Sequence, residues 1–504
     1  MMPSPAYPDF APNYDAGRPQ VVWTTLVADL ETPVSTMLKL VKGRPNSFLL
    51  ESVEGGAVRG RYSLIGFEPD LIWRCRGDAS EVNRRALGAN GGGFEPMEGG
   101  ALQALRRLVA ESQIPDIPDG LPPMSAGLFG YMGYDMVRLM ERLPDNNPDV
   151  LGLPDGMFLR PSVMAVFDNI EDVVTVITPV WPKGETTAQE AYDEAMVRLE
   201  AVIDDLARPL PHESPADGAD SEPPVARSNM TREDFHRMVE SAKDYIVAGD
   251  AFQIVPSQRF AVPFTLPSFT LYRALRRLNP SPFLFHLDFG DFAIVGSSPE
   301  LLVRLRDDKV TIRPIAGTRP RGATPAEDRA LAEDLLADPK ELAEHLMLLD
   351  LARNDVGRVA RIGSVEVTEK MTIENYSHVM HIVSNVQGEI DDGHDAIDAL
   401  VGGFPAGTVS GAPKVRAMEI IDELEPERRS VYAGCIGYFA ANGTMDNCIA
   451  LRTAVVKDGT MYVQAGGGIV ADSDPELEYQ ESCNKAKALI RAAEEAVRFA
   501  TDGR

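Results

Sequence analysis

Three charged side chains near the C-terminus have a spacing that suits a binding or catalytic site. Glu478, Glu481 and Lys485 lie three and four positions apart in a run with helical periodicity, so they fall on one face of the predicted helix. Three glycines at 466–468 precede this helix where a strand-like run ends, and their bare amides suit a carboxylate ligand. A surface ladder of Glu–Lys pairs is the alternative, because such pairs are common on exposed helices.

A second acidic helix is predicted at 338–355. Its apolar periodicity puts Glu344, next to His345, beside a largely buried stripe. A carboxylate there has to be paired, protonated or bound to a cation. With the first acidic helix opposite, a hard divalent ion such as Mg2+ fits, since it takes one or two carboxylates from each element. Zinc is disfavoured, because the close pair His378 and His381 has neither an HExxH context nor a nearby cysteine. A buried, hydrogen-bonded histidine is the alternative at each position.

An arginine-containing stretch raises the question of an anionic ligand. Residues 314–322, PIAGTRPRG, follow an alternating segment and are predicted to form a loop in which a Gly-Thr pair precedes Arg319 and Arg321. The chain has a formal net charge of −27. Such a protein attracts an anionic small molecule through a local basic cluster rather than through its overall field.

Composition disfavours several classes of function. The acidic balance argues against nucleic acid and anionic membrane surfaces as partners. Four cysteines without a CxxC pair indicate a reducing cytoplasm, and we find neither a signal peptide nor an apolar run of about 18 residues that could span a membrane. GTVSGAPK at 407–414 has the wrong spacing for a phosphate loop, and Cys435 has the apolar flanks of a strand interior.

The elements that must position these side chains mix strands and helices. Strand-like runs lie at 172–180, 291–298, 309–315, 448–456 and 460–466. Helical patterns lie at 187–207, after Thr231 up to Gly249, at 338–355, and from Pro475 with Ser473 or Asp474 as the cap. The proline-rich acidic run 206–229 predicts a flexible linker between an N-terminal region, 1–205, and a C-terminal region, 230–504. We therefore expect a mixed α+β protein with mostly antiparallel sheets.

Long segments in one order resemble the chorismate-utilising enzymes, and within them the large subunits, component I, of anthranilate synthases. They cover most of residues 231–490 and include GDAFQIVPSQRF, NPSPFLFHLDFGDFAIVGSSPE, PIAGTRPRG, KELAEHLMLLDLARNDVGR, YSHVMHIVS, GTVSGAPKVRAMEII and QAGGGIVADSDPELEYQE. FLLESVEGGAVRGRYSLIG, at 48–66, resembles the tryptophan-binding segment of that family. The resemblance implies two large, mostly antiparallel sheets packed as an α/β/β/α sandwich, with 230–504 as the chorismate-binding catalytic domain.

The resemblance also implies roles for matching positions. Glu300 would be the general acid that protonates the leaving 4-hydroxyl, His381 would serve the loss of the ring proton as pyruvate is eliminated, and Thr408 would align the ring. The implied Mg2+ ligands are Glu344, Glu478 and Glu481. The implied chorismate contacts are Gly317, Thr318, Tyr432, Arg452, Gly466, Gly467, Gly468 and Lys485.

Two positions separate the members of this family. Ala316 stands where aminodeoxychorismate synthases carry a nucleophilic lysine. Gln253 stands where isochorismate and salicylate synthases carry the lysine that activates water. Both favour ammonia as the nucleophile and anthranilate as the product. An aminodeoxychorismate synthase component I or an isochorismate synthase is the alternative enzyme. A catalytically silent, tryptophan-sensing subunit is the alternative from another class, and the full set of implied catalytic residues argues against it.

Partners and regulation follow from the same resemblance. The chain has no recognisable glutaminase module, so a separate glutamine amidotransferase subunit, component II, is implied to deliver ammonia, typically in a heterotetramer with two copies of each. Feedback inhibition by L-tryptophan is implied, because anthranilate formation is the first committed step of its biosynthesis. The implied inhibitor site pairs two ammonium-binding residues with an apolar wall: Glu51 and Ser52 with Pro282, Phe283 and Leu284. A strand end packed on a hydrophobic turn is the alternative.

Overall fold

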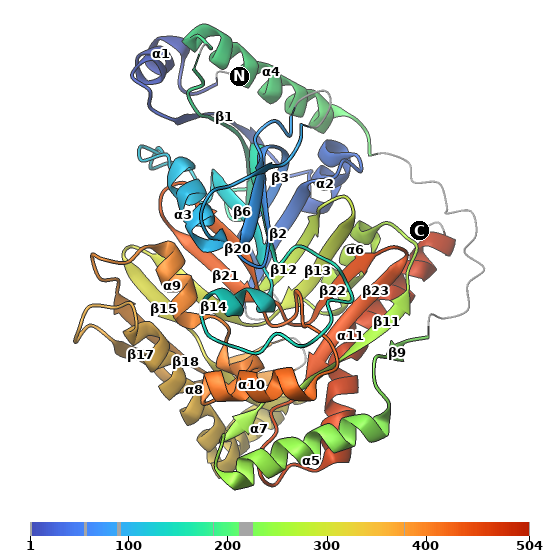
Figure 1. Cartoon of the computed structure of the whole chain (residues 1–504). Helices are drawn as coiled ribbons and strands as arrows, with labels where there is room; N and C mark the ends of the chain where they lie inside the picture. The colour runs from blue at the N-terminus through green and yellow to red at the C-terminus, as the bar shows by residue number, and fades with distance from the viewer. Residues whose placement is uncertain are drawn as a thin grey trace.

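Helices surround a central body of strands in the computed structural model of this chain, which describes residues 3–54, 58–87, 92–184, 186–210, 225–376 and 379–502 (Figure 1). All of the strand pairs it describes are antiparallel. The α-helices are α1 (Tyr7–Asp15), α2 (Pro33–Val41), α3 (Ala101–Glu111), α4 (Ala188–Ala207), α5 (Arg232–Ala248), α6 (Ser268–Leu278), α7 (Pro325–Ala337), α8 (Pro339–Gly357), α9 (Ala396–Gly403), α10 (Lys414–Leu424) and α11 (Pro475–Asp502). Two 3-10 helices are η1 (Tyr134–Leu139) and η2 (Gly407–Val409).

Two long strands are shared by two sheets. β3 (Val58–Arg76) and β7 (Gly156–Asp168) pair with each other along most of their length, with a register shift after Pro69. The N-terminal half of β3 pairs with β2 (Ser47–Glu54), and its C-terminal half pairs with β4 (Ala79–Asn83). Proline has no N–H for the ladder, so Pro69 suits the point where the strand passes from one sheet to the other.

The first sheet continues from β2 and β7 in both directions. Beyond β7 come β8 (Val173–Val180) and β1 (Gln20–Val27). Beyond β2, the order is β12 (Phe283–Asp288), β13 (Phe292–Ser298), β22 (Thr453–Lys457), β23 (Thr460–Gly466), β11 (Ser257–Pro263) and β9 (Arg227–Ser228).

The second sheet starts from the other halves of the shared strands. β5 (Glu95–Pro96) pairs with β4 at one edge. On the far side of β7, the order is β6 (Gly127–Met132), β20 (Cys435–Ala440), β21 (Met445–Ile449), β14 (Leu301–Arg306), β15 (Lys309–Ile312) and β18 (Val379–Glu389). β18 also pairs with β16 (Ile315–Pro320) and β17 (Glu366–Asn375). A separate ladder joins β10 (Gln253–Ile254) to β19 (Gly411–Ala412).

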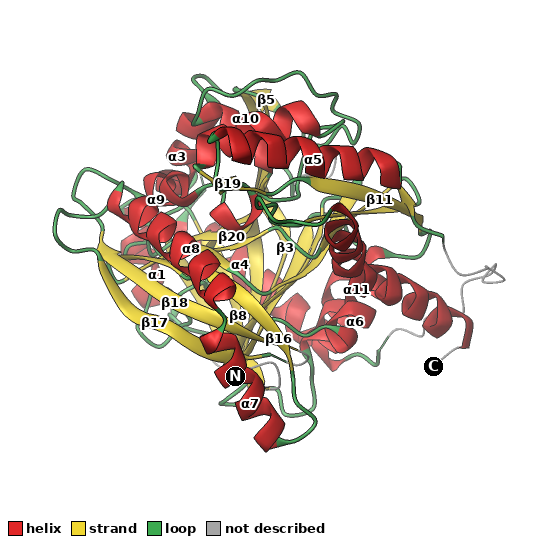
Figure 2. Ribbon diagram, turned by 90° about the horizontal axis from the view of Figure 1, so that it is seen from below, coloured by secondary structure: helices red, strands yellow, loops and turns green. Residues whose placement is uncertain are grey.

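Three apolar cores separate four layers, which confirms the predicted α+β sandwich. One core lies between the two sheets and includes Phe48, Phe129, Phe285 and Ile436. Another lies between the outer face of the first sheet and α1, α2, α4, α6 and α11. A third covers the outer face of the second sheet with α3, α8, α9 and α10. Figure 2 shows α8, the helix that contains Glu344, lying against β17 and β18 of the second sheet.

The predicted linker divides the sequence but not the sheets. Strands from 1–205 and from 230–504 pair directly, as β2 does with β12 and β6 with β20. Of the run 206–229, residues 211–224 lie outside the described part of the chain, and β9 near its end joins the first sheet. Both regions therefore contribute to each sheet.

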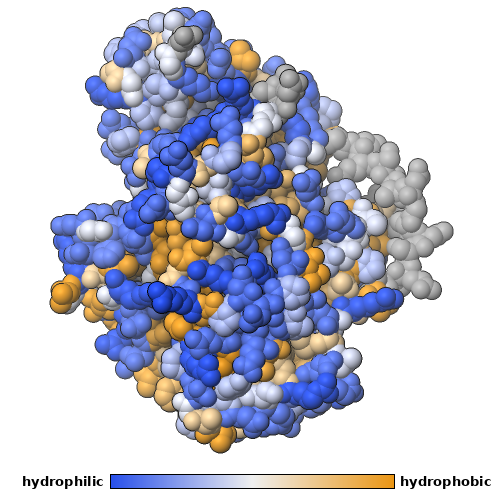
Figure 3. Space-filling view, in the orientation of Figure 1, coloured by the Kyte–Doolittle hydropathy of each residue, from blue (hydrophilic) through white to orange (hydrophobic). Residues whose placement is uncertain are grey.

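Local capping signals were read correctly from the sequence. Thr231 caps α5 in a capping box and Gly249 ends it in the left-handed conformation. Asp474 accepts the amides of Glu476 and Leu477 at the start of α11. No helix in the described residues is long and apolar enough to cross a membrane. Figure 3 shows that hydrophilic residues cover most of this face, in keeping with the net charge of −27.

Two strand predictions need correction. Residues 314–322 were expected to form a loop, but Ile315–Pro320 forms strand β16, bulged between Ala316 and Thr318. The run 448–456 was expected to be one strand, but it divides into β21 and β22 around Arg452, whose φ is +48°. Alternation alone cannot reveal either feature, because a bulge and a turn of this kind depend on the partner strands.

Candidate active site

Glu300 lies between β13 and β14 with its carboxyl group removed from water. Its side chain is buried, and the Thr408 hydroxyl donates a 2.8 Å hydrogen bond to its Oε1. Burial raises the pKa of Glu300 to about 8, against the opposing effects of the Thr408 hydroxyl, the Ile315 main chain and Arg452. Glu300 is therefore protonated at neutral pH and can give its proton to a departing group.

His381, on β18, faces the Gly-Thr pair of β16. Its Nδ1 lies 3.0 Å from the carbonyl oxygen of Gly317 and 3.1 Å from Thr318 Oγ1. A carbonyl oxygen only accepts, so Nδ1 carries the proton and Nε2 keeps its lone pair. Burial lowers the pKa of His381, and Arg452 lowers it further, while the hydrogen bond to Gly317 opposes both. The neutral ring can thus accept a proton at Nε2.

The bulge in β16 orients this pair. The register with β18 shifts between Ala316 and Thr318, and Gly317 has a φ of +75°, which favours glycine. A Cβ atom at Gly317 would also lie 3.1 Å from the Ile382 side chain. The bulge directs the Gly317 carbonyl and the Thr318 hydroxyl to the same ring nitrogen of His381, so both residues contact the candidate base.

Arg452 is a half-buried side chain without a counterion among the residues that the structure describes. No hydrogen bond or ion pair joins its side chain to a described residue, and burial lowers its pKa although Tyr376 and Glu300 oppose this. Its positive φ is uncommon for a side chain of this size, and such strain clusters at functional sites. A guanidinium held in this way is suited to bind a carboxylate through two parallel hydrogen bonds.

Glu344 supplies a partly buried carboxylate from α8. The Gln253 amide donates a 3.2 Å hydrogen bond to its Oε1. Burial raises the pKa of Glu344, and repulsion from Glu341 and Glu481 adds to the rise, whereas Gln253 and Lys485 oppose it. Glu344 thus lies within electrostatic reach of the acidic face of α11, as the sequence predicted.

The first turns of α11 add two more carboxylates. Burial raises the pKa of Glu478, and Glu481 adds to the rise, while Ser473 opposes it with a 2.7 Å hydrogen bond. Lys485 Nζ lies 2.8 Å from Glu481 Oε1 and 2.9 Å from the carbonyl oxygen of Gly466.

Two glycines lie close to the side chains of this acidic group. A Cβ atom at Gly467 would lie 2.9 Å from Glu478 Oε2. A Cβ atom at Gly468 would lie 2.4 Å from the Gln253 amide nitrogen. The glycine segment after β23 therefore lies directly against the carboxylates, which the sequence alone only suggested.

This donor set suits a hard divalent cation. The carboxylates of Glu344, Glu478 and Glu481 outnumber the ammonium groups of Lys485 and Lys340 that act on them, so the group is net negative. In the described ranges, no three histidine, cysteine or acidic side chains already converge on one point. Mg2+ binds through one or two carboxylates and keeps several waters, so the separation of these carboxylates does not argue against it.

Tyr432 closes another wall of the site. Burial raises the pKa of Tyr432 to about 12, against the opposing effects of Arg429 and a hydrogen bond with the Gly466 main chain. Gly466 also accepts from Lys485. Tyr432 and Lys485, both predicted substrate contacts, thus meet at the end of β23.

Sequence reasoning missed Tyr376. Its ring packs edge-on against His381 with 5.3 Å between ring centroids, and its hydroxyl donates a 3.1 Å hydrogen bond to Glu374. Glu374 and Tyr376 lie two positions apart where β17 ends. This alternation was the only signal for Tyr376 in the sequence. The neighbouring His378 lies outside the described part of the chain.

Arg319, in β16, and Arg321, just after it, brace the fold. Arg319 pairs with Asp334 of α7, with Asp338 between α7 and α8, and with Glu341 of α8. Arg321 makes a bidentate contact with Asp328. Since carboxylates of the chain already contact both guanidinium groups, Arg452 is the better candidate to bind an anion in this region.

A cavity lies between the two sheets. This cavity of about 900 Å³ is lined at one end by Leu50, Ser52, Pro282, Phe283 and Tyr438. Its other end reaches Pro299, Leu301 and Tyr376, which flank Glu300 and His381. The predicted inhibitor-binding residues therefore share a cavity that extends to the back of the candidate active site.

The contacts of Glu51 bear on its predicted role. Glu51 was expected to bind an ammonium group, but its carboxylate accepts from Arg276, at 2.6 and 2.8 Å, and from the hydroxyl of Tyr272. Leu284, expected in the apolar wall, lines the cavity beside Phe283 and also packs with the helix-covered core.

Comparisons with known proteins agree with this geometry. A family model described as chorismate binding enzyme matches residues 69–491. Anthranilate synthase component 1 of Cereibacter sphaeroides is 61% identical over 98% of this chain and 98% of that protein. The same component of Pseudomonas putida is 50% identical over 92% of this chain and 93% of its own.

Solved structures agree as well. Anthranilate synthase component I from Streptococcus pneumoniae superposes with a TM-score of 0.74 at 39% identity, covering 86% of this chain and 92% of that one. The menaquinone-specific isochorismate synthase of Escherichia coli has a TM-score of 0.70 at 20% identity, covering 95% of each chain, and so shows a shared fold alone.

Proposed function

Since the chain belongs to the chorismate binding enzymes, and within them to the anthranilate synthase component 1 family, we propose that it forms anthranilate and pyruvate from chorismate and ammonia. We propose further that the reaction needs Mg2+ and is inhibited by L-tryptophan. The observation that carries the proposal is Glu300, an acid protonated at neutral pH near the unpaired guanidinium of Arg452.

The first step replaces the 4-hydroxyl of chorismate. Arg452 holds a substrate carboxylate, and the amides of the glycine segment after β23 and the Lys485 ammonium add positive charge beside it. Glu300 gives its proton to the 4-hydroxyl, which leaves as water while ammonia bonds to the ring. The Thr408 hydroxyl keeps the Glu300 carboxyl in place during this transfer.

The second step restores aromaticity. His381 Nε2 takes the ring proton at the aminated carbon, and the enolpyruvyl group leaves as pyruvate. The Gly317 carbonyl holds Nδ1–H and so keeps the lone pair at Nε2. Overall, chorismate and ammonia give anthranilate, pyruvate and water.

A Mg2+ ion would be held by Glu344 and Glu481, with Glu478 beside them. When bound, it supplies charge that stabilises a substrate carboxylate as the hydroxyl departs. The excess of negative charge around these residues supports this proposal.

Mg2+ should raise the Tm of the wild-type chain, and Glu344→Gln should remove most of that rise. At a Mg2+ concentration one hundred times Kd, binding adds about 2.7 kcal/mol of stability. Differential scanning fluorimetry with and without Mg2+ measures it. The matched control is Asp350→Asn on the same helix, since Asp350 is exposed, pairs with Arg353 and is not among the charges that act on Glu344. An equal Mg2+-dependent rise in Tm in both variants would show that Glu344 does not bind Mg2+.

L-tryptophan is proposed to bind the cavity between the sheets. Ser52 supplies a hydroxyl there, and Pro282 and Phe283 supply apolar surface. The extension of the cavity to residues beside Glu300 gives the inhibitor a physical route to the chemistry.

Ser52→Ala should weaken tryptophan inhibition by about tenfold to a hundredfold, since a hydrogen bond to a charged group contributes about 1.5–3 kcal/mol. Inhibition curves of the two proteins measure the change, and the uninhibited rate should stay close to the wild-type rate. Leu287→Met is the control, because Leu287 lies on the same strand β12 and is not among the residues that line the cavity. Unchanged inhibition in Ser52→Ala would place the inhibitor elsewhere.

Ammonia is proposed to come from a separate glutaminase subunit. The name component 1, shared by the curated relatives, supports a second component. We propose two copies of each subunit in the complex. The four cysteines are unpaired thiols, which supports a location in the cytoplasm.

Product identity tests the proposed function. The chain is incubated with chorismate, Mg2+ and ammonium, with and without L-tryptophan, and the product is identified by fluorescence and mass. Anthranilate supports the proposal, whereas intact chorismate contradicts it. Isochorismate or aminodeoxychorismate would point to the alternative enzymes, which Ala316 and Gln253 disfavour because neither side chain acts as the lysine of those enzymes does.

A further inference from the structure

A fully buried ion pair lies behind the candidate active site and has no part in the chemistry above. Arg429 and Glu425 are 2% and 4% exposed. Arg429 Nη2 donates to Glu425 Oε1 over 2.6 Å, and Nε donates to Oε2 over 3.0 Å. A buried pair of this kind adds little net stability compared with apolar side chains of equal volume. Its contacts with neighbouring segments therefore need a separate explanation.

Arg429 holds the main chain beside two residues of the site. Its Nη1 donates a 2.6 Å hydrogen bond to the carbonyl oxygen of Val409, which follows Thr408 in η2. Its Nη2 donates a 2.7 Å hydrogen bond to the carbonyl oxygen of Val255, two residues after Gln253. One planar guanidinium thus connects the segment that contacts Glu300 with the segment that contacts Glu344.

The same pair also reaches the substrate-facing end of β23. Glu425 Oε1 accepts from the amide and the hydroxyl of Ser257, at 2.8 and 2.7 Å. Ser257 pairs with Gly466 in the ladder between β11 and β23. The guanidinium of Arg429 lies 5.5 Å from the ring centroid of Tyr432. Four site segments therefore share one buried anchor.

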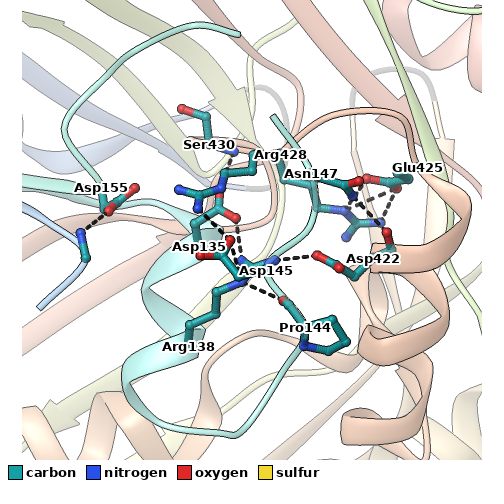
Figure 4. A network of polar contacts seen from close by, with 12 residues as sticks. Asp135, Arg138, Pro144, Asp145, Asn147, Asp155, Asp422, Glu425, Arg428 and Ser430 are labelled. Carbon is teal, nitrogen blue, oxygen red and sulfur yellow. Dashed lines mark hydrogen bonds and ion pairs between the residues drawn. The ribbon is translucent and has the colours of Figure 1, made fainter. Parts of the chain in front are cut away.

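The anchor is itself fixed from the outside. Figure 4 shows Glu425 at the edge of a polar network that joins η1 to the segment after α10. Asp135 accepts the amide of Ser430 over 2.8 Å, and Asn147 donates to the carbonyl oxygen of Asp422 over 2.8 Å. The ring of Tyr134 lies 4.8 Å from the Arg429 guanidinium. These contacts leave the side chains of Arg429 and Glu425 little freedom to move.

We propose that Arg429 is a positioning residue for this reaction: its guanidinium holds the Val409 carbonyl and so keeps the Thr408 hydroxyl on Glu300. The inference rests on the roles proposed for Glu300 and Thr408. Arginine suits the position because its planar fork meets one carboxylate and two carbonyl oxygens at once. Lysine keeps the charge but lacks the fork.

Arg429→Lys should lower kcat on the order of a hundredfold, because small misplacements of catalytic groups reduce rates by that much. The KM for chorismate should change less. In this variant the Thr408 hydroxyl moves away from Glu300, and its hydrogen bond no longer lowers the pKa of Glu300. The descending limb of the pH–rate profile should therefore move to higher pH, which loss of stability alone does not cause.

A double-mutant cycle identifies the route. If Arg429 acts through Thr408, adding Thr408→Val to Arg429→Lys lowers kcat little further, whereas additive effects would overturn the proposal. Arg160→Lys is the matched control, because Arg160 makes a buried bidentate pair with Asp70, at 2.8 and 2.8 Å, away from the site. It should lose stability and keep the wild-type kcat and pH profile.

A second variant covers a failure of Arg429→Lys to fold. Glu425→Gln keeps an acceptor for Ser257 but leaves Arg429 without its counterion, so we expect the same shift of the pH limb, only smaller. Wild-type kcat and pH limb in either folded variant would overturn the positioning role. The wild-type product assay separately tests the proposed function, so the two failures are distinguishable.

Discussion

Glu300→Gln should lower the rate of anthranilate formation by about a hundredfold to ten-thousandfold, the range that general acid catalysis supplies. The amide has the same shape as the acid but no proton to give the departing hydroxyl. Thr408 can still donate its hydrogen bond to the amide oxygen, so the local structure should persist. Steady-state assays with chorismate, Mg2+ and ammonium measure the loss.

The pH dependence gives this prediction a second readout. Burial raises the pKa of Glu300 to about 8, so the active, protonated form is present below that value. The wild-type rate should fall as pH rises through about 8, and Glu300→Asp, which keeps an acid, should retain a descending limb at a lower rate. With the concentration of free ammonia held constant at each pH, a wild-type rate that stays level from pH 7 to 10 would contradict the role of Glu300 as the acid.

The raised pKa of Glu300 also makes the free energy of unfolding depend on pH. In the unfolded chain a glutamate titrates near its ordinary value of about 4.3, so between that value and about 8 the folded chain binds the extra proton. Stability contributed by this group therefore falls as pH rises through that window. Glu300→Gln has no such group, so its stability relative to wild type should increase from pH 5 to pH 8 in urea unfolding.

Arg452→Met should lower kcat/KM by a factor of about thirty to several thousand, because removing one partner of a buried charge pair costs about 2–5 kcal/mol. The pair in question is the one that Arg452 makes with a substrate carboxylate. Steady-state kinetics over a range of chorismate concentrations measure the loss, and we expect most of it in KM.

Arg452→Met should nevertheless leave the unfolding free energy unchanged or higher. The guanidinium is desolvated without a counterion among the described residues, so its removal leaves no partner behind. Arg160→Met is the control, because it abandons the buried carboxylate of Asp70 and should lose about 3–5 kcal/mol. Equal losses of stability in both variants would show that Arg452 serves the fold rather than the ligand.

Helix boundaries and helix faces were readable from the sequence because they depend on neighbours along the chain. The cap at Thr231, the stop at Gly249 and the cap at Asp474 are local hydrogen-bonding signals, and the structure confirms each. Helical spacing likewise placed Glu478 and Lys485 on one face of α11. The family resemblance supplied the sandwich architecture, and comparison with known proteins confirms it.

Strand details were less readable because they depend on partners far away in the sequence. β16 was taken for a loop, since the bulge at Gly317 exists only against β18. The turn at Arg452 interrupts an alternating run that looks continuous. The family resemblance predicts that Glu51 binds the ammonium group of an inhibitor, yet its carboxylate pairs with Arg276 of α6. In each case a partner that no local pattern reveals decided which way the chain or the side chain turned.

The sequence by itself thus determined the helices, their acidic faces and the family, since these follow from local spacing and from long matching segments. Only the tertiary structure decided the electrostatics of the site. The pKa of Glu300 rises because many segments together exclude water from it, and Arg452 lies within electrostatic reach of Glu300 without an ion pair to a described residue. Desolvation is summed over contacts from the whole chain, so no stretch of sequence contains it.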